Sequence, residues 1–182
     1  MTTENELHDI IGGYQKSFIA KTYGEENTDI DLLMNVFGIS PELKKENKQY
    51  WGRELGKCWE SLVVSIFKNI DGFKPALKVD ADEPCDFRIN DYAVDTKYRV
   101  GSGDSGTLKK FKQYGALLSD KGYTPVFLFL REDNLPAAIT ACRKGGWAVL
   151  CGQDSFDFIL DKTGFDFKQF LIEHAKEYDV GR

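Results

Sequence analysis

The chain has 182 residues and a formal net charge of −5, and 42% of its residues are hydrophobic. This length suffices for one domain with its own core, and the apolar content excludes a disordered protein. No apolar run approaches the roughly 20 residues that a membrane span needs, and the polar start lacks the form of a signal peptide. We therefore expect a soluble, cytoplasmic protein without membrane contact. The acidic balance argues against a general nucleic-acid coat, so a DNA enzyme with this composition needs its positive charge concentrated locally.

The first fifty residues predict a helical region. Apolar residues recur in steps of three and four from Leu7 to Phe18 and again further along. Gly12-Gly13 and Gly24 interrupt this pattern, so we expect two or three short helices rather than one long one.

A short helix and a long helix follow. Pro41 suits the first turn of the short helix, with Ser40 as its cap, and residues 42–49 are polar enough to be solvated. The strongest helix pattern runs from Tyr50 to about residue 69. Its apolar residues share one face that predicts packing against a sheet. They are Leu55, Trp59, Leu62, Val63, Ile66 and Phe67.

A β-hairpin is predicted after this helix. Phe87 and Ile89 alternate with polar residues, Asn90-Asp91 can turn, and a second alternating strand starts at Tyr92. A first strand is expected at residues 76–79. The acidic loop that follows it, at 80–84, either joins a metal site or, more simply, is solvated.

Acids and a lysine occupy fixed places on this hairpin. Asp86 opens the first strand, and Asp95 and Lys97 lie two residues apart on the second, so they point to the same face. Such charges on a half-buried strand are costly unless something compensates them. Carboxylates from neighbouring strands suit Mg²⁺, which keeps water and substrate phosphate oxygens as further ligands. Lys97 is then placed to act on a metal-bound water or on the phosphate.

Asp86, followed nine positions later by Asp95-Thr96-Lys97, resembles the D…(D/E)-x-K core of the PD-(D/E)XK nucleases, which include many type II restriction endonucleases. The family's leading Pro-Asp is imperfect, because Cys85 separates Pro84 from Asp86. The resemblance implies an α/β fold with a central mixed sheet flanked by helices, here with an N-terminal helical region. It also implies a Mg²⁺ ion held by the two aspartates and the Thr96 carbonyl.

The same resemblance implies one more acid. In these nucleases a helix before the hairpin often supplies it, and Glu60, one turn after Gly56, matches that position as a metal ligand and catalytic residue. The simpler interpretation is a surface residue at the edge of the apolar stripe. Glu54 is the alternative acid, but it lies about 240° around the helix from Glu60, so both cannot point to one place.

Residues 101–107 satisfy the G-x-G-x-x-G pattern of dinucleotide-binding loops. The preceding strand is charged where a doubly wound sheet needs an apolar run, and the helix that opens at Leu108 is rich in lysine, so nucleotide binding is disfavoured. We expect the glycines, the hydroxyls of Ser102, Ser105 and Thr107, and the helix start to bind a DNA backbone phosphate.

Positive charge is concentrated between residues 97 and 113, where five basic residues face Asp104 alone. This is the local basic patch that a DNA enzyme of this composition needs, although lysines on the solvent side of a helix are the simpler interpretation. The predicted DNA contacts there are Arg99, Lys109, Lys110, Lys112 and Gln113, the last by its resemblance to a polar helix residue near the site in related nucleases.

The remaining elements continue an α/β order. Residues 123–130 predict a strand buried on both faces, and residues 135–144 a helix with Pro136 in its first turn. A strand at 147–151 and a helix at 166–178 follow. Scattered cysteines predict reduced, mostly buried thiols rather than a zinc site. We expect one nuclease domain over 1–182, with a helical region at 1–50 and a catalytic core at 51–182.

The leading hypothesis is a Mg²⁺-dependent endodeoxyribonuclease that resembles a type II restriction endonuclease and cuts double-stranded DNA at a specific, palindromic sequence. A homodimer cuts both strands most simply, with the N-terminal helices as its dimer surface or as a DNA clamp. Residues 131–134 and the loop after Arg99 are candidate base readers through their position beside the expected cleft. Two alternatives stay open: a structure-specific or repair nuclease, and a non-catalytic module that binds nucleic acid or nucleotide.

Overall fold

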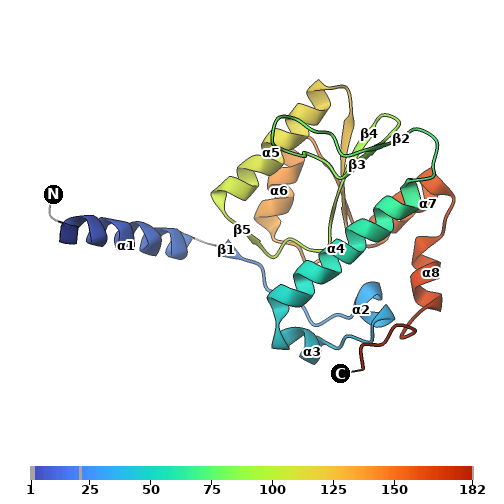
Figure 1. Ribbon diagram of the computed structural model, residues 1–182, viewed down its shortest axis with the longest axis horizontal. Coiled ribbons are helices and arrows are strands. Elements are labelled where there is room, and N and C mark those ends of the chain that lie inside the picture. The colour runs from blue at the N-terminus through green and yellow to red at the C-terminus, as the bar shows by residue number, and fades with distance from the viewer. Residues whose placement is uncertain (1–2, 21, 182) are drawn as a thin grey trace.

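A mixed five-stranded sheet lies between two helical layers in the computed structural model, which describes residues 3–20 and 22–181 (Figure 1). The predicted class, an α/β protein with a central mixed sheet flanked by helices, is confirmed. The strands are β1 (Thr22–Tyr23), β2 (Phe73–Pro75), β3 (Phe87–Ile89), β4 (Tyr92–Lys97), β5 (Ser102–Gly103), β6 (Thr124–Phe129) and β7 (Ala148–Cys151). The helices are α1 (Thr3–Ala20), α2 (Leu32–Val36), α3 (Pro41–Glu46), α4 (Lys48–Phe67), α5 (Ser105–Asp120), α6 (Pro136–Lys144), α7 (Gln153–Thr163) and α8 (Phe167–Glu173).

The strand order of the main sheet is β2-β3-β4-β6-β7. The first three strands are antiparallel, and β4, β6 and β7 are parallel. The predicted hairpin is β3–β4, and its turn residue Asn90 has a φ of 49°, which Asn tolerates better than most residues. The strand expected at 76–79 was wrong: the edge strand is three residues earlier, because Phe73 pairs with Ile89 and its ring stacks on Phe87.

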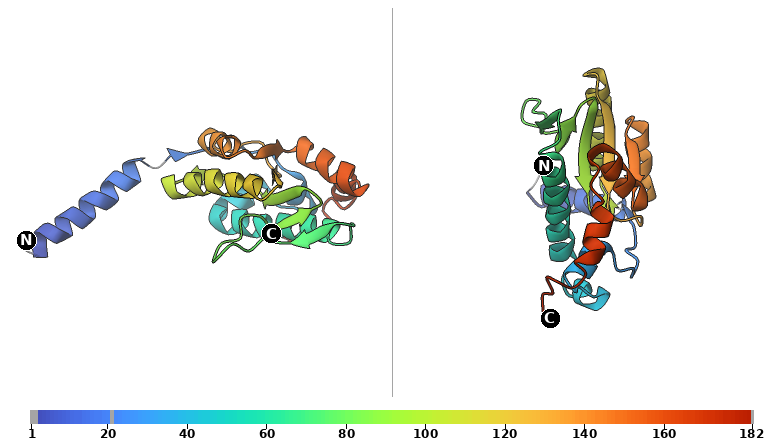
Figure 2. Two further views of the ribbon diagram at one scale, coloured as in Figure 1. Left: turned by 90° about the horizontal axis from the view of Figure 1, so that it is seen from above. Right: turned by 90° about the vertical axis from the view of Figure 1, so that its right-hand side faces the viewer.

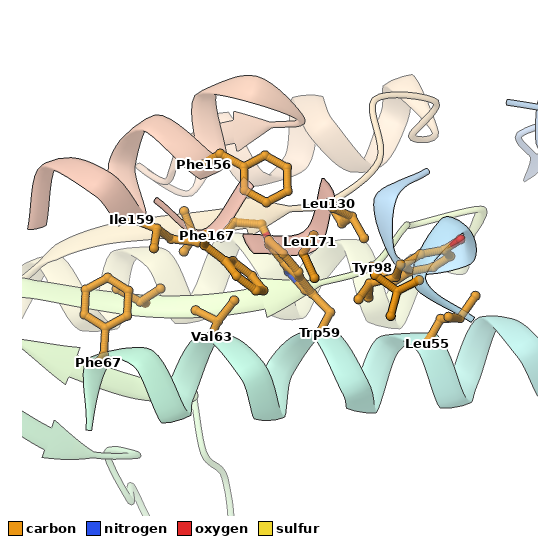
Figure 3. Packing of buried hydrophobic residues seen from close by; sticks show 14 of the residues in the cluster. Leu55, Trp59, Val63, Phe67, Tyr98, Leu130, Phe156, Ile159, Phe167 and Leu171 are labelled. Atoms are coloured by element: carbon orange, nitrogen blue, oxygen red, sulfur yellow. The ribbon is translucent and has the colours of Figure 1, made fainter. Parts of the chain in front are cut away.

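One face of the sheet is covered by α4, α7 and α8 (Figure 3). The long predicted helix is confirmed as α4. Trp59 is fully buried, stacks on Phe167 at 5.7 Å between ring centroids, and donates from Nε1 to the Leu128 carbonyl at 3.1 Å. This contact fixes α4 across the centre of the sheet.

The other face is covered by α5 and α6, whose buried residues pack on Phe127 and Phe129. Where these two helices meet, Gly115 leaves room for the Gly145 carbonyl: a Cβ at Gly115 would lie 2.2 Å from that oxygen.

All four cysteines are unpaired, and burial raises the pKa of Cys142 to about 12, which suits an inert core thiol.

The N-terminal region divides at β1. Before it, α1 is one continuous helix through Gly12-Gly13, so the expected break there was wrong, and α1 projects away from the rest of the molecule (Figures 1 and 2). After it, α2 and α3 pack into the core under α4. Ser40 caps α3 as predicted, but Lys44, expected in a solvated segment, is only 5% exposed.

The C-terminal third follows the prediction as far as β7. Pro136 begins α6, and β6 is buried over five of its six residues. Helix α7 was not predicted, and α8 ends at Glu173 instead of near 178. The chain turns there because the backbone amides of Lys176, Tyr178 and Val180 donate to carbonyls at 35–37. Within the described residues, no helix is both long and apolar enough to cross a membrane.

Candidate active site

Asp86 and Asp95 lie across from each other at the open end of the β3–β4 hairpin. Asp86 directly precedes Phe87, which pairs with Val94, and its own amide donates to the Val94 carbonyl at 2.9 Å. Its carboxylate Oδ2 accepts hydrogen bonds from the backbone amide and the hydroxyl of Thr96, both at 2.7 Å. Two donors on one residue thus hold Asp86 beside the end of β4.

Lys97 contacts Asp95 and Thr96 at the same end of the hairpin. Its Nζ donates to Asp95 Oδ1 at 2.7 Å and to the Thr96 carbonyl at 3.1 Å. Both acceptors are oxygens that the sequence analysis assigned to a metal ion. In this structure the lysine ammonium is the cation that compensates them.

Glu60 approaches the same group from α4. The helix runs close to the end of β4, because a Cβ on Gly56 would be only 3.8 Å from the Tyr98 Cβ, and Glu60 follows one turn later. Partial burial and the negative charge of Asp86 raise the pKa of Glu60, while Lys97 lowers it. Glu60 is exposed to solvent, yet its charge acts on the hairpin residues.

The site carries more negative than positive charge. Burial raises the pKa of Asp95 to about 7, and the charges of Asp86 and Glu60 add to this against the effect of Lys97. Burial on its own would lower the pKa of Lys97, but Asp95 and Asp86 outweigh it and the pKa is raised. Three carboxylates facing one ammonium form an electrostatic setting that attracts a further cation.

Asp86, Asp95 and the Thr96 carbonyl are the oxygen donors at this end of the hairpin that could hold a metal ion. Among the described residues, no three His, Cys, Asp or Glu side chains are grouped closely enough to hold a metal ion. Mg²⁺ is commonly bound through one or two carboxylates, with water and phosphate oxygens completing its shell. Asp86 and Asp95 provide such a pair, and the Thr96 carbonyl is a further hard oxygen next to them.

The choice between the two candidate helix acids favours Glu60. The carboxylate of Glu54 instead accepts from Arg53 Nε at 2.8 Å and from Lys57 Nζ at 3.3 Å on the outer side of α4. These neighbours lower the pKa of Glu54, so this acid is already compensated.

The lysines predicted to contact DNA lie on the exposed side of α5. Lys109, Lys112 and Gln113 are exposed, and Lys110 Nζ lies 3.4 Å from Asp82 Oδ1 of the acidic loop. That loop is solvated, as the simpler interpretation held, and it reaches α5 through this contact. The positive surface of α5 is therefore partly neutralised at Lys110.

The glycine-rich loop is organised differently from the expected phosphate site. Helix α5 begins at Ser105 rather than Leu108, because Asp104 caps it and accepts from the Thr107 amide at 2.7 Å. A carboxylate thus already occupies the place where we expected the helix to bind an anion, which disfavours Ser105 and Thr107 as phosphate contacts. Ser102 is exposed in β5, which pairs with β1.

Arg99 is also held inside the protein. Its guanidinium donates to the carbonyls of Gly24 and Asp133, both at 3.0 Å, and pairs with the Asp133 carboxylate at 3.2 Å. The side chain is only 11% exposed. Arg99 therefore holds the segments at Gly24 and Asp133 together, which disfavours the DNA contact that we expected.

Sequence reasoning missed a buried ionic cluster next to Lys97. Arg131, suggested above as a base reader, has a side chain that is 4% exposed and pairs with Asp31 at 3.0 Å and Asp133 at 2.8 Å. The Tyr98 hydroxyl bonds to Asp31 and to Lys44, and Lys44 pairs with Glu26. The only signal in the sequence is that Arg131 and Asp133 follow directly after the most apolar strand.

A groove of about 890 Å³ lies beside the site, between the first half of α4 and the β1–β5 pair. Its wall includes Tyr98, the residue after Lys97. Two basic residues, Lys48 and Arg53, and two acidic residues, Glu25 and Glu26, also line it. Gly52 and Gly101 also line it, so the backbone is accessible at these points.

Comparisons of the chain with protein-family models, with curated proteins and with solved structures find no match. What the protein does is therefore argued from the geometry of the site.

Proposed function

We propose that this protein is a Mg²⁺-dependent endodeoxyribonuclease that resembles a type II restriction endonuclease and hydrolyses double-stranded DNA at a specific, palindromic sequence. The observation that carries the proposal is the arrangement of Asp86, Asp95 and Lys97 at the end of the hairpin, with the charge of Glu60 acting on them from α4. The mixed sheet with α4 against its hairpin is compatible with the restriction-endonuclease-like core that the motif implies.

The two hairpin aspartates and the Thr96 carbonyl are the groups that would hold Mg²⁺, and Glu60 would bind a second ion or a water. Bound Mg²⁺ supplies Lewis-acid activation of the phosphodiester and a more acidic water. Asp86 is kept in place by its two hydrogen bonds from Thr96, so its carboxylate is positioned before substrate arrives.

Lys97 acts in this proposal as a positively charged donor to the phosphate. Its pKa is raised by the carboxylates around it, so the side chain remains protonated at neutral pH. A protonated amine does not accept a proton, but it stabilises negative charge that develops on phosphate oxygens. Lys48 and Arg53 are the groove residues that would contact the DNA backbone, although Glu25 and Glu26 place negative charge in the same wall.

The test is cleavage of a supercoiled plasmid of known sequence by the purified protein, with Mg²⁺ and with EDTA. We expect discrete fragments with Mg²⁺ and none with EDTA. Asp86→Asn, Asp95→Asn and Lys97→Ala should each reduce the cleavage rate by about a hundredfold or more and still bind DNA. Glu54→Gln, on the outer side of the same helix as Glu60, is the matched control and should keep nearly full activity.

The same experiment separates the alternatives. Cleavage confined to branched or damaged DNA would replace the restriction function by that of a structure-specific or repair nuclease. DNA binding that is insensitive to EDTA, with no cleavage of any substrate, would reject catalysis altogether. Full activity in any one of the three variants would remove that residue from its proposed role.

A further inference from the structure

We propose that Lys97 competes with Mg²⁺ for Asp95 and the Thr96 carbonyl, so that its ammonium reaches the DNA phosphate only after the metal has displaced it. The inference rests on the Mg²⁺ site of the proposed function and describes how that site is controlled. Its basis is that Lys97 Nζ donates to Asp95 Oδ1 at 2.7 Å and to the Thr96 carbonyl at 3.1 Å. These are two of the three oxygen groups on the hairpin that would hold the metal.

A metal ion on the same oxygens would repel this ammonium. Like charges a few ångströms apart disfavour each other, and the effect is stronger in a site that is shielded from water. Asp95 is only 8% exposed, so solvent screens its surroundings poorly. Asp95 and the Thr96 carbonyl therefore serve either the ammonium or the metal, and Lys97 has to move when the metal binds.

Asp86 has partners of another kind. Its Oδ2 accepts hydrogen bonds from the amide and the hydroxyl of Thr96, which are neutral donors and carry no net charge against a metal ion. Asp86 is thus the ligand that is ready before the metal binds, and Asp95 is the ligand that Lys97 has to release.

The contacts of Lys97 are local, which allows this movement. Its two hydrogen bonds go to residues one and two positions earlier in the same strand. The nearby cation Arg131 instead bonds to residues 100 and 102 positions earlier, and so holds distant segments together. The Lys97 side chain is 40% exposed, against 4% for Arg131, so its outer side is open to a phosphate. Release of Lys97 from its two acceptors therefore separates no distant segments.

A permanent ion pair is the competing explanation of the same contacts. Under that explanation Lys97 is a structural partner of Asp95, and Mg²⁺ binds beside it without moving it. Under competition Mg²⁺ frees the amine. The two explanations therefore differ in whether the metal changes the contacts of Lys97.

The release of Lys97 is measured by acetylation with N-hydroxysuccinimide acetate, followed by mass spectrometry of the peptide that contains this residue. The full-length wild type is labelled without DNA, once in EDTA and once in Mg²⁺. We expect acetylation of Lys97 to rise severalfold in Mg²⁺, because the amine is no longer held by its two acceptors. Lys57, which pairs with Glu54 on the outer side of α4, is the internal control and should be labelled equally in both.

The competition itself is measured by isothermal titration calorimetry of Mg²⁺ into the full-length protein, without DNA and at pH 9, where protons compete little with the metal. Lys97→Met keeps a side chain of similar length near the Phe127 ring and removes the charge. Its dissociation constant for Mg²⁺ should be about tenfold lower than that of the wild type. Lys97→Arg keeps the charge and should bind Mg²⁺ as weakly as the wild type does. Lys57→Met is the matched control and should leave the constant unchanged.

Two results would overturn the proposal: acetylation of Lys97 that Mg²⁺ leaves unchanged, or a folded Lys97→Met variant that binds Mg²⁺ no more tightly than the wild type. Urea unfolding verifies that the variant is folded, and if it is not, the acetylation of the wild type decides alone. None of these measurements depends on cleavage. Tighter Mg²⁺ binding by a protein that cuts no DNA would keep the competition and remove the nuclease, and cleavage with an unreleased lysine would do the reverse.

Discussion

Asp95 is an acid in a place where burial opposes its charge. It is 8% exposed and its pKa is raised to about 7, although Lys97 lies 2.7 Å away. An unfolded aspartate titrates near 4, so the folded state holds the proton more tightly than the unfolded state does. Ionisation of Asp95 therefore lowers stability as the pH rises from about 4 to about 7.

Asp95→Asn should remove this pH dependence. In buffer with EDTA, the variant and the wild type should be about equally stable near pH 4, where both side chains are neutral. At pH 8 the variant should be more stable by about 4 kcal/mol, because one pKa unit corresponds to about 1.4 kcal/mol and the raised pKa of Asp95 already includes its pair with Lys97. Urea denaturation at several pH values measures the difference, and a constant difference over this range would contradict the assignment.

Arg131 stabilises the folded protein, whereas ionised Asp95 destabilises it. Removing Arg131 from the buried ionic cluster leaves the charge of Asp31 without its salt-bridge partner and leaves Asp133 with Arg99 alone. Arg131→Ala should lower the free energy of unfolding by about 3–5 kcal/mol. Arg53→Ala, whose partner Glu54 is on the surface, should change it little, and equal losses in the two variants would show that burial is not the reason.

At the scale of single residues, spacing in the sequence was sufficient to predict that Asp86, Asp95 and Lys97 lie at the same end of the hairpin. Residues at fixed positions of a hairpin have fixed neighbours. The positions of Arg99 and Arg131 could not be predicted in the same way. Their partners Gly24 and Asp31 are far away in the chain, and only the folded structure brings them together.

Among the elements, α5 and α6 meet more closely than most helices do. A Cβ on Gly115 would lie 2.2 Å from the Gly145 carbonyl and 2.6 Å from Trp147 Nε1. The indole of Trp147 already donates to the Phe111 carbonyl at 2.8 Å, so it cannot move aside without losing that bond. The glycine is thus required by the contact, not by helix geometry.

Gly115→Ala should therefore destabilise the protein by about 1–3 kcal/mol, against the usual gain for this substitution within a helix. Gly52→Ala in α4 is the control, because a Cβ there would meet nothing within 4 Å. It should stabilise the protein by about 0.5–1 kcal/mol. Thermal unfolding measures both, and a gain in both variants would refute the close contact.

The elements that could be predicted are those whose pattern is local. Helix α4 has a regular apolar face, and β6 is a continuous apolar run. Helix α7 was missed because only part of its face is apolar, and its buried Phe156 and Ile159 complete a core built by α4 and α8. The break expected in α1 rested on glycine propensity alone, which tertiary or partner contacts can outweigh.

For the whole molecule, the proposed function requires that both strands of one DNA duplex be cut. If the protein cuts both strands as a dimer, the wild type should convert supercoiled plasmid directly to linear DNA. If α1 is the dimer surface expected from the sequence, Ile11→Glu, which leaves the candidate site unchanged, should instead accumulate nicked circles and cut the second strand later. Agarose gels over time distinguish the two courses; direct linearisation by a variant shown to be monomeric would mean that one site cuts both strands.

The segment after α1 is tied to the body at many points. Strand β1 pairs with β5, the amide of Gly24 donates to the Gly101 carbonyl, and Glu26 and Asp31 compensate Lys44 and Arg131. For protein engineering, this sets how far the amino terminus can be shortened. Deletion as far as residue 21 would spare all these contacts, whereas deletion as far as 31 would remove Glu26 from buried Lys44 and leave Arg131 with Asp133 as its acidic partner.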